Sequence, residues 1–192
     1  MTELNDNYRM YGLVPYNISP IQQGIQFGHA VQEYNNMMMD TSAEGLAAFN
    51  EWRKECKTFI ILNGGTTNKR MKGNFEFTGS LNKHLDELVG MGIQVATFEE
   101  PDLGDQLTAV VFLVPNTVYN KELVPDFWDW EPAVKAFKEF GTPRRLLDFK
   151  FGEIHAEDFD DAEKLLFNEW VELVGGEKYV RLRFFLQNFR LA

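Results

Sequence analysis

Residues 18–34, ISPIQQGIQFGHAVQEY, form the stretch from which the rest of the chain is interpreted. Ser19 followed by Pro20 is typical of a helix start, because serine caps the first turn and proline fits the first helical position. The apolar spacing then continues to Met38 or Met39. We therefore predict a long helix that begins at Pro20.

Two isoleucines and two glycines share one part of this helix. Ile21 and Ile25 are four residues apart, so we expect them to face the interior, with Gly24 and Gly28 beside them. A glycine inside a helix costs about 1 kcal/mol relative to alanine. Two of them within five residues indicate a close approach by another backbone or by a ligand.

The same helix has an uncharged polar side. Gln22, Gln26, His29 and Glu33 follow at spacings of four, three and four residues, which aligns them in one stripe. A solvated helix face would explain the stripe, and so would a binding or catalytic surface. Periodicity identifies the face without identifying a reaction.

Short strands and helices alternate on both sides of this segment. The last two strands are separated only by a short turn, PDLGD, which predicts an antiparallel pair. The order favours an α/β sandwich with a mixed sheet. We expect strands over 9–16, 57–65, 93–100 and 107–114, helices over 43–55 and 81–90 with Ser80 as the cap of the latter, and a polar loop over 66–78.

The composition changes after residue 116. Residues 1–116 are predicted to form the core, and 117–175 an acidic and aromatic accessory region packed on it, with an acidic helix over about 156–174. The run PDFWDWEP at 125–132 favours a packing patch or a protein-binding surface, because its acids repel phosphate. Residues 176–192 are predicted to be a basic C-terminal tail.

The composition limits the function classes. The 192 residues are 44% hydrophobic with 17 Phe, which is typical of a globular chain. The net charge of −10 argues against non-specific nucleic-acid binding, although residues 178–190 carry four bases and no acid. The apolar runs are too short to cross a bilayer, and the N-terminus lacks a signal pattern. With one cysteine, Cys56, the expected compartment is the cytoplasm.

No metal or cofactor is expected. His29 and Glu33 are four residues apart on the predicted helix, but a third ligand at a motif spacing is missing from the sequence. The glycines of NGGTTNKR at 63–70 lack the Gly-Lys-Ser/Thr ending of a phosphate loop, so this segment is predicted to be a turn after a strand.

Three separated motifs resemble the archaeal/eukaryotic-type (type II) peptidyl-tRNA hydrolase family, in particular its bacterial and phage branch. The helix stretch matches the family's Gln-(apolar or Cys)-Gly-His-Ala signature at 26–30 and the branch's Ser-Pro-x-Gln-Gln opening at 19–23. EWRKECKTFIIL at 51–62 resembles the helix end before a central strand, and FEEPDLGDQLTAVVF at 98–112 the motif before the last strand. The resemblance covers about residues 10–116. It implies a three-layer α/β/α sandwich with a mixed, mainly four-stranded sheet.

The resemblance also implies a chemistry, hydrolysis of the ester between a peptide and the 3′ end of tRNA. The family's catalytic threonine corresponds to Thr108 and its acid to Glu100 or Asp102. The family's lysine position holds Gln22, which brings no positive charge. We expect Gln22, His29, Glu100 and Thr108 to be catalytic, and Gln26, Asp102, Lys69 and Arg70 to bind substrate, the last two replacing the missing charge.

Two function classes follow. One is a peptidyl-tRNA hydrolase-like enzyme that contacts tRNA through local basic patches. The other is a non-catalytic member of the fold that binds a protein, through region 117–175, or tRNA. The sequence leaves the oligomeric state open, with a homodimer as one alternative, and predicts no membrane contact.

Overall fold

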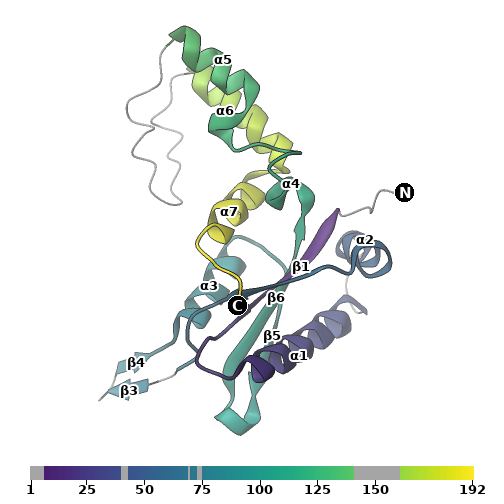
Figure 1. Cartoon of the computed structure of the whole chain (residues 1–192), viewed down its shortest axis with the longest axis vertical. Helices are drawn as coiled ribbons and strands as arrows, with labels where there is room; N and C mark the ends of the chain where they lie inside the picture. The colour runs from purple at the N-terminus through teal and green to yellow at the C-terminus, as the bar shows by residue number, and fades with distance from the viewer. Residues whose placement is uncertain (1–6, 40–42, 69, 73–74, 141–160) are drawn as a thin grey trace. The chain divides into compact units, whose positions relative to one another are not determined.

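The structure divides into two compact units. The computed structural model describes residues 7–39, 43–68, 70–72, 75–140 and 161–192 (Figure 1). Residues 1–115 and 189–192 form the first unit, and residues 116–188 form the second. The predicted division after residue 116 lies beside this boundary. The predicted tail over 176–192 is not a separate segment, because most of it is the helix α7 (Glu177–Leu186) of the second unit.

The first unit is built on a four-stranded mixed sheet in the order β2-β1-β6-β5. β1 pairs parallel to β2 and antiparallel to β6, and β5 pairs antiparallel to β6, as the short turn between them predicted. The strands are β1 (Tyr8–Val14), β2 (Phe59–Asn63), β5 (Val95–Glu100) and β6 (Gln106–Pro115).

Helices cover both faces of this sheet (Figure 1). One face packs against α1 (Pro20–Met39), α2 (Ala43–Glu51) and the π-helical turn η1 (Trp52–Cys56), and α3 (Ser80–Gly90) packs against β6 from the other. The fold is therefore an α/β sandwich with a mixed four-stranded sheet, as predicted.

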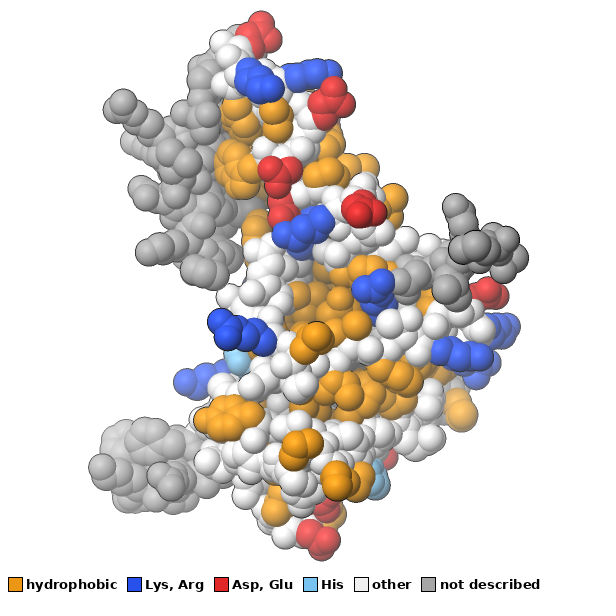
Figure 2. Space-filling model, in the orientation of Figure 1, with side chains coloured by type: hydrophobic (Ala, Val, Ile, Leu, Met, Phe, Trp, Pro, Cys, Tyr) orange, Lys and Arg blue, Asp and Glu red, His pale blue; other side chains and the backbone are white. Residues whose placement is uncertain are grey.

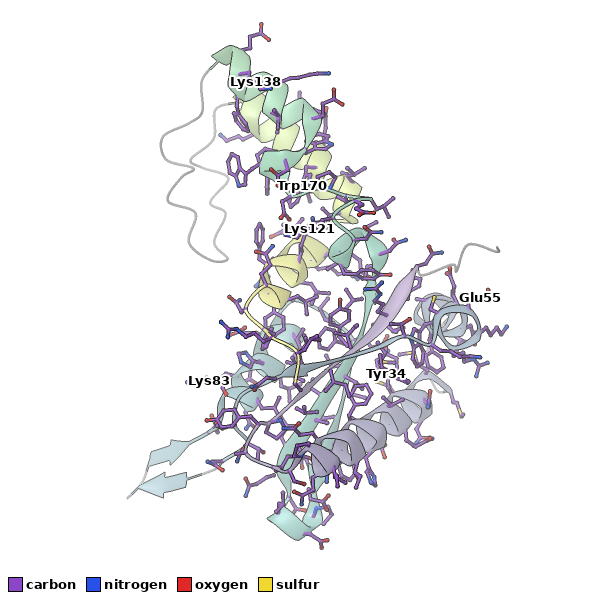
Figure 3. All side chains as sticks on the ribbon, viewed as in Figure 1. Tyr34, Glu55, Lys83, Lys121, Lys138 and Trp170 are labelled. Carbon is purple, nitrogen blue, oxygen red and sulfur yellow. The ribbon has the colours of Figure 1, made fainter. Side chains whose placement is uncertain are left out.

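The buried side of α1 differs from the prediction. Ile21 and Ile25 are 77% and 50% exposed, whereas Phe27 and Tyr34 are buried against the sheet (Tyr34 is labelled in Figure 3). The two aromatic rings offer more apolar area than the isoleucines, so their burial sets the rotation of the helix. The expectation that Ile21 and Ile25 face inward was wrong.

The close approach between helix and sheet lies at a different glycine. A Cβ added at Gly12, in β1, would collide with the ring of Phe27, so this strand glycine lets the helix side chain reach the backbone. A Cβ at Gly24 or Gly28 would meet nothing within 4 Å. Of the predicted close approaches at these two helix glycines, the one by another backbone is therefore absent.

Replacing Gly24 by alanine is expected to raise the unfolding free energy by about 0.5–1 kcal/mol, because the helix gains propensity and the new methyl group enters open space. Urea unfolding followed by circular dichroism measures the change. Gly12→Ala is the matched control and should destabilise, since its methyl group overlaps Phe27. A loss of stability in Gly24→Ala would contradict this account of the exposed helix face.

Two local predictions were also wrong. The segment predicted as a loop over 66–78 contains a short antiparallel hairpin of β3 (Arg70–Lys72) and β4 (Phe75–Phe77). Ser80 does not cap α3, whose N-cap is Gly79. The Ser80 hydroxyl instead accepts a hydrogen bond from the Thr66 backbone N–H at 2.9 Å and lies 3.3 Å from the Gly64 carbonyl oxygen. The serine therefore holds the preceding loop.

The end of the chain pairs with the free edge of the sheet. Leu191 forms an antiparallel bridge with Leu62 of β2. The Asn63 N–H donates to the Arg190 carbonyl at 2.9 Å, and the Ala192 N–H donates to the Ile61 carbonyl at 3.0 Å. This contact covers backbone groups that an edge strand leaves unpaired.

The second unit has its own aromatic core. Phe127, in the 3₁₀ turn η3 (Phe127–Asp129), is buried and packs edge-on to Phe167 at a centroid distance of 5.3 Å. The run at 125–132 thus supplies packing, although Trp128 remains 36% exposed. The other helices are α4 (Asn116–Tyr119), α5 (Glu131–Phe140) and α6 (Asp161–Val174).

His84 links α3 to the C-terminal residues and predicts a pH dependence. The His84 ring lies 4.8 Å from that of Phe189, measured between centroids. Burial lowers the pKa of His84, and the nearby Glu87 only partly offsets this effect. The unfolded chain therefore binds the proton more readily than the folded chain does. The contribution of His84 to the free energy of unfolding is full above the ordinary histidine pKa and is lost as the pH falls below it.

His84→Gln should make this acid-side loss shallower, by at most about 1.4 kcal/mol per pH unit, the slope for one proton. Unfolding free energies measured between neutral and mildly acidic pH test the expectation, with His29→Gln as the control because His29 is exposed. An unchanged slope in His84→Gln would rule out His84 as the titrating group.

Candidate functional site

A buried amide connects three elements of the first unit. Gln26, on α1, is only 5% exposed. Its Nε2 donates a hydrogen bond to Oε2 of Glu100 at the end of β5. Its Oε1 lies 3.1 Å from the hydroxyl of Thr108, which donates to it. Because a carboxylate only accepts hydrogen bonds, the two bonds fix the orientation of the amide.

A β-bulge brings Thr108 to this position. Phe98 pairs with Ala109 whereas Glu99 pairs with Leu107, so Thr108 is the extra residue on β6. A bulge interrupts strict alternation and re-aims a side chain. The Thr108 hydroxyl is fully buried and also lies 3.2 Å from the Phe98 carbonyl oxygen. Without the bulge, the regular alternation of β6 would aim the Thr108 side chain in another direction.

The turn after Glu100 holds the carboxylate from its other side. The Glu100 Oε1 accepts a long hydrogen bond, 3.4 Å, from the Asp102 backbone N–H, at the start of the 3₁₀ turn Pro101–Leu103. The Asp105 N–H closes the turn onto the Glu100 carbonyl at 3.0 Å. Glu100 is half-buried and the side chain of Asp102 is exposed. Of the two alternatives for the acid, Glu100 joins the network with its side chain.

His29 lies on the exposed side of this network. It is one turn along α1 from Gln26, and its ring stacks on Phe98 with a centroid distance of 4.4 Å and an angle of 29°. The stacking restrains the imidazole while leaving it accessible. Phe98 thus belongs to the site, but only the tertiary structure places its ring beside His29.

Gln22 takes part in the helix cap. Its Oε1 accepts from the Ser19 backbone N–H at 3.0 Å, and its own N–H donates to the Ser19 hydroxyl at 3.3 Å. This reciprocal pair is a capping box. Gln22 is exposed and makes no described bond to Gln26, Glu100 or Thr108. The structure does not bring it into the network.

The two expected cations are not placed with the site. Lys69 lies outside the described residues, and of Arg70 only the backbone, at the start of β3, is described. Helix α1 itself contains no lysine or arginine. The described part of the network is therefore neutral except for the carboxylate of Glu100.

Thr67 contacts β6 just before Thr108 and was missed by sequence reasoning. It is 2% exposed, and its hydroxyl donates to the carbonyl of Leu107, the residue before Thr108. Its backbone N–H donates to Oδ1 of Asn17 at 3.3 Å. The glycine-rich turn thus ties β6 to the loop before α1, a contact that its sequence did not signal.

Chemically, this arrangement can hold one carboxylate in a fixed orientation with an accessible imidazole nearby. A positioned carboxylate can accept a proton from water. Across the described ranges, no three His, Cys, Asp or Glu side chains gather to hold a metal ion. In those ranges every helix is too short or too polar to cross a membrane.

The comparisons with known proteins add no assignment. No protein-family model matches the chain, and no curated protein matches it significantly.

Proposed function

We propose that the chain hydrolyses the ester joining a peptide to the 3′ end of a tRNA, or a related ester or amide. The observation that carries the proposal is the Gln26 amide, which binds Thr108 and Glu100 at the same time. It holds the carboxylate in one orientation before substrate arrives, which is what a general base requires.

In the proposed reaction, a water bound to Glu100 transfers a proton to the carboxylate while its oxygen attacks the ester carbonyl carbon. The carbon–oxygen bond to the ribose then breaks, and Glu100 returns the proton to the leaving oxygen. His29 supplies an N–H donor to the developing oxyanion. Gln22 brings no charge, so a rate about ten- to a hundred-fold below that of a lysine-assisted site is expected.

Peptide release from purified peptidyl-tRNA tests this proposal. Glu100→Gln should lower kcat by about 100-fold or more, the usual contribution of a general base, with little change in stability. Glu99→Gln, the exposed neighbour, is the matched control and should retain activity. Release by Glu100→Gln at the wild-type rate would contradict the role of Glu100.

A second candidate is a non-catalytic binding module. The observation that favours it is the engagement of the Gln22 side chain in a helix cap, at the position that by the resemblance corresponds to the family's lysine. Wild-type protein that binds tRNA but releases no peptide above background would support this candidate over the hydrolase.

A further inference from the structure

The turn between α2 and β2 carries exposed positive charge on an acidic protein. Arg53, Lys54 and Lys57 are exposed within five residues of a chain whose net charge is −10. Figure 2 shows Lys and Arg side chains gathered at the right of the first unit, where Figure 3 labels Glu55. Among the described residues, Lys54 and Lys57 form no ion pair.

Two acids lie in the same segment. Glu51 accepts a hydrogen bond from the side-chain amide of Asn7, and Glu55 is exposed on η1. The three bases therefore exceed the acids by one over residues 51–57. The excess is small, so charge alone does not define a partner.

The backbone of this turn is unusual. The Lys57 N–H donates to the Trp52 carbonyl at 2.9 Å, which closes a π-helical turn. Such turns are rare in proteins, and those that occur often lie at functional sites. Lys57 itself has φ 53°, in the left-handed region where glycine is relaxed and a lysine is strained. A cation therefore occupies a position whose backbone conformation favours glycine.

An exposed aromatic ring follows the turn. Phe59 opens β2 and is 48% exposed. Its ring is supported edge-on by Phe27 at 5.3 Å and by Trp52 at 5.4 Å between centroids. Supported rings that remain open to solvent can stack a nucleobase, and the neighbouring cations suit the phosphates on either side.

We propose that Lys54, Lys57 and Phe59 form a binding surface for single-stranded RNA, with a base on Phe59 and phosphates on the lysines. The inference deepens the proposed function, because the unpaired 3′ end of a tRNA is single-stranded RNA. The surface and the site share α1, because the ring of Phe59 packs on Phe27, the residue after Gln26.

Fluorescence anisotropy of a short mixed-sequence RNA oligonucleotide with the full chain, over a KCl series, tests the surface. Lys57→Gly should lower the affinity at low salt and reduce the slope of log K against log salt by about 0.7, one phosphate contact. Its melting temperature should be unchanged or higher, because glycine relaxes the left-handed turn. Phe59→Leu, which keeps an apolar side chain, should weaken binding by about ten-fold.

Lys83→Gln is the matched control, since it removes an exposed lysine from α3 in the same unit, and it should leave the slope unchanged. The surface is overturned if wild-type protein binds no RNA at low salt, if Lys83→Gln weakens binding as much as Lys57→Gly, or if an acidic peptide competes as well as RNA. Glu100→Gln should bind RNA like the wild type. Bound RNA without peptide release would therefore contradict the proposed hydrolysis alone.

Discussion

Replacing Gln26 by leucine is expected to lower kcat for peptide release by about 100-fold and the unfolding free energy by about 2 kcal/mol. Leucine fills the buried position but leaves the Thr108 hydroxyl and one oxygen of Glu100 without the amide that now binds both. The carboxylate then loses its fixed orientation, and a buried hydroxyl loses its acceptor on α1. Steady-state release and urea unfolding of the same preparation measure the two effects separately.

Gln23→Leu is the control for this substitution. Gln23 is half-buried three residues before Gln26 on α1, and its side chain donates to the Pro15 carbonyl at 3.0 Å, outside the network. Its loss should cost stability without lowering kcat. Combining Gln26→Leu with Thr108→Val should be less damaging than the sum of the two, because both act on one network. Full activity in Gln26→Leu would show that the network has no catalytic role.

Replacing Arg183 by methionine is expected to destabilise the second unit by about 3–5 kcal/mol, the range for breaking a buried charge pair. Arg183 is 2% exposed, and its guanidinium donates to Asp126 Oδ1 at 2.9 Å and to the carbonyls of Thr117 at 3.1 Å and Val124 at 2.7 Å. It also lies 5.8 Å from the Trp170 ring centroid. One side chain therefore contacts α4, the segment 124–126 and α6.

The pKa of Asp126 gives this prediction a second readout. Burial raises the pKa of Asp126, but Lys121 and Arg183 outweigh the burial, so the pKa lies below its ordinary value. The stabilisation that ionised Asp126 gives the folded unit is full above the ordinary aspartate pKa and is lost as the pH falls below it. Removing Arg183 should raise the pKa of Asp126 and weaken this acid dependence.

Near-UV circular dichroism during guanidinium unfolding follows the second unit, which holds three of the four tryptophans. Arg181→Met is the matched control, because Arg181 is exposed on the same helix. Arg183→Lys should not restore stability, since a lysine lacks the planar fork that reaches several acceptors. Equal stability of the Arg181 and Arg183 variants would refute the role of the buried guanidinium.

The order of elements in the sheet could be predicted because it depends on local signals. Ser19 and Pro20 start a helix in any context, and PDLGD is too short for a crossover. The rotation of α1 could not be predicted from spacing, because apolar residues lie on both of its sides. Phe27 is buried because Gly12 leaves room for its ring, and that pairing joins residues that spacing does not relate.

The site shows the same division between local and tertiary information. The resemblance grouped Gln26, Glu100 and Thr108, which the structure brings together through hydrogen bonds. The bulge that aims Thr108 depends on the register of two strands. The engagement of Gln22, by contrast, was visible in the sequence, since Ser-x-x-Gln is a capping-box pattern. The catalytic role expected of Gln22 therefore has an ordinary structural alternative, the helix cap.

The most direct test of the account is a single turnover of peptidyl-tRNA by excess wild-type protein in heavy-oxygen water. The account predicts peptide release well above the uncatalysed rate, with one heavy oxygen in the peptide carboxylate and none in the side chain of Glu100. Release no faster than in buffer, or heavy oxygen in the Glu100 carboxylate, would contradict a carboxylate that acts as a general base on water.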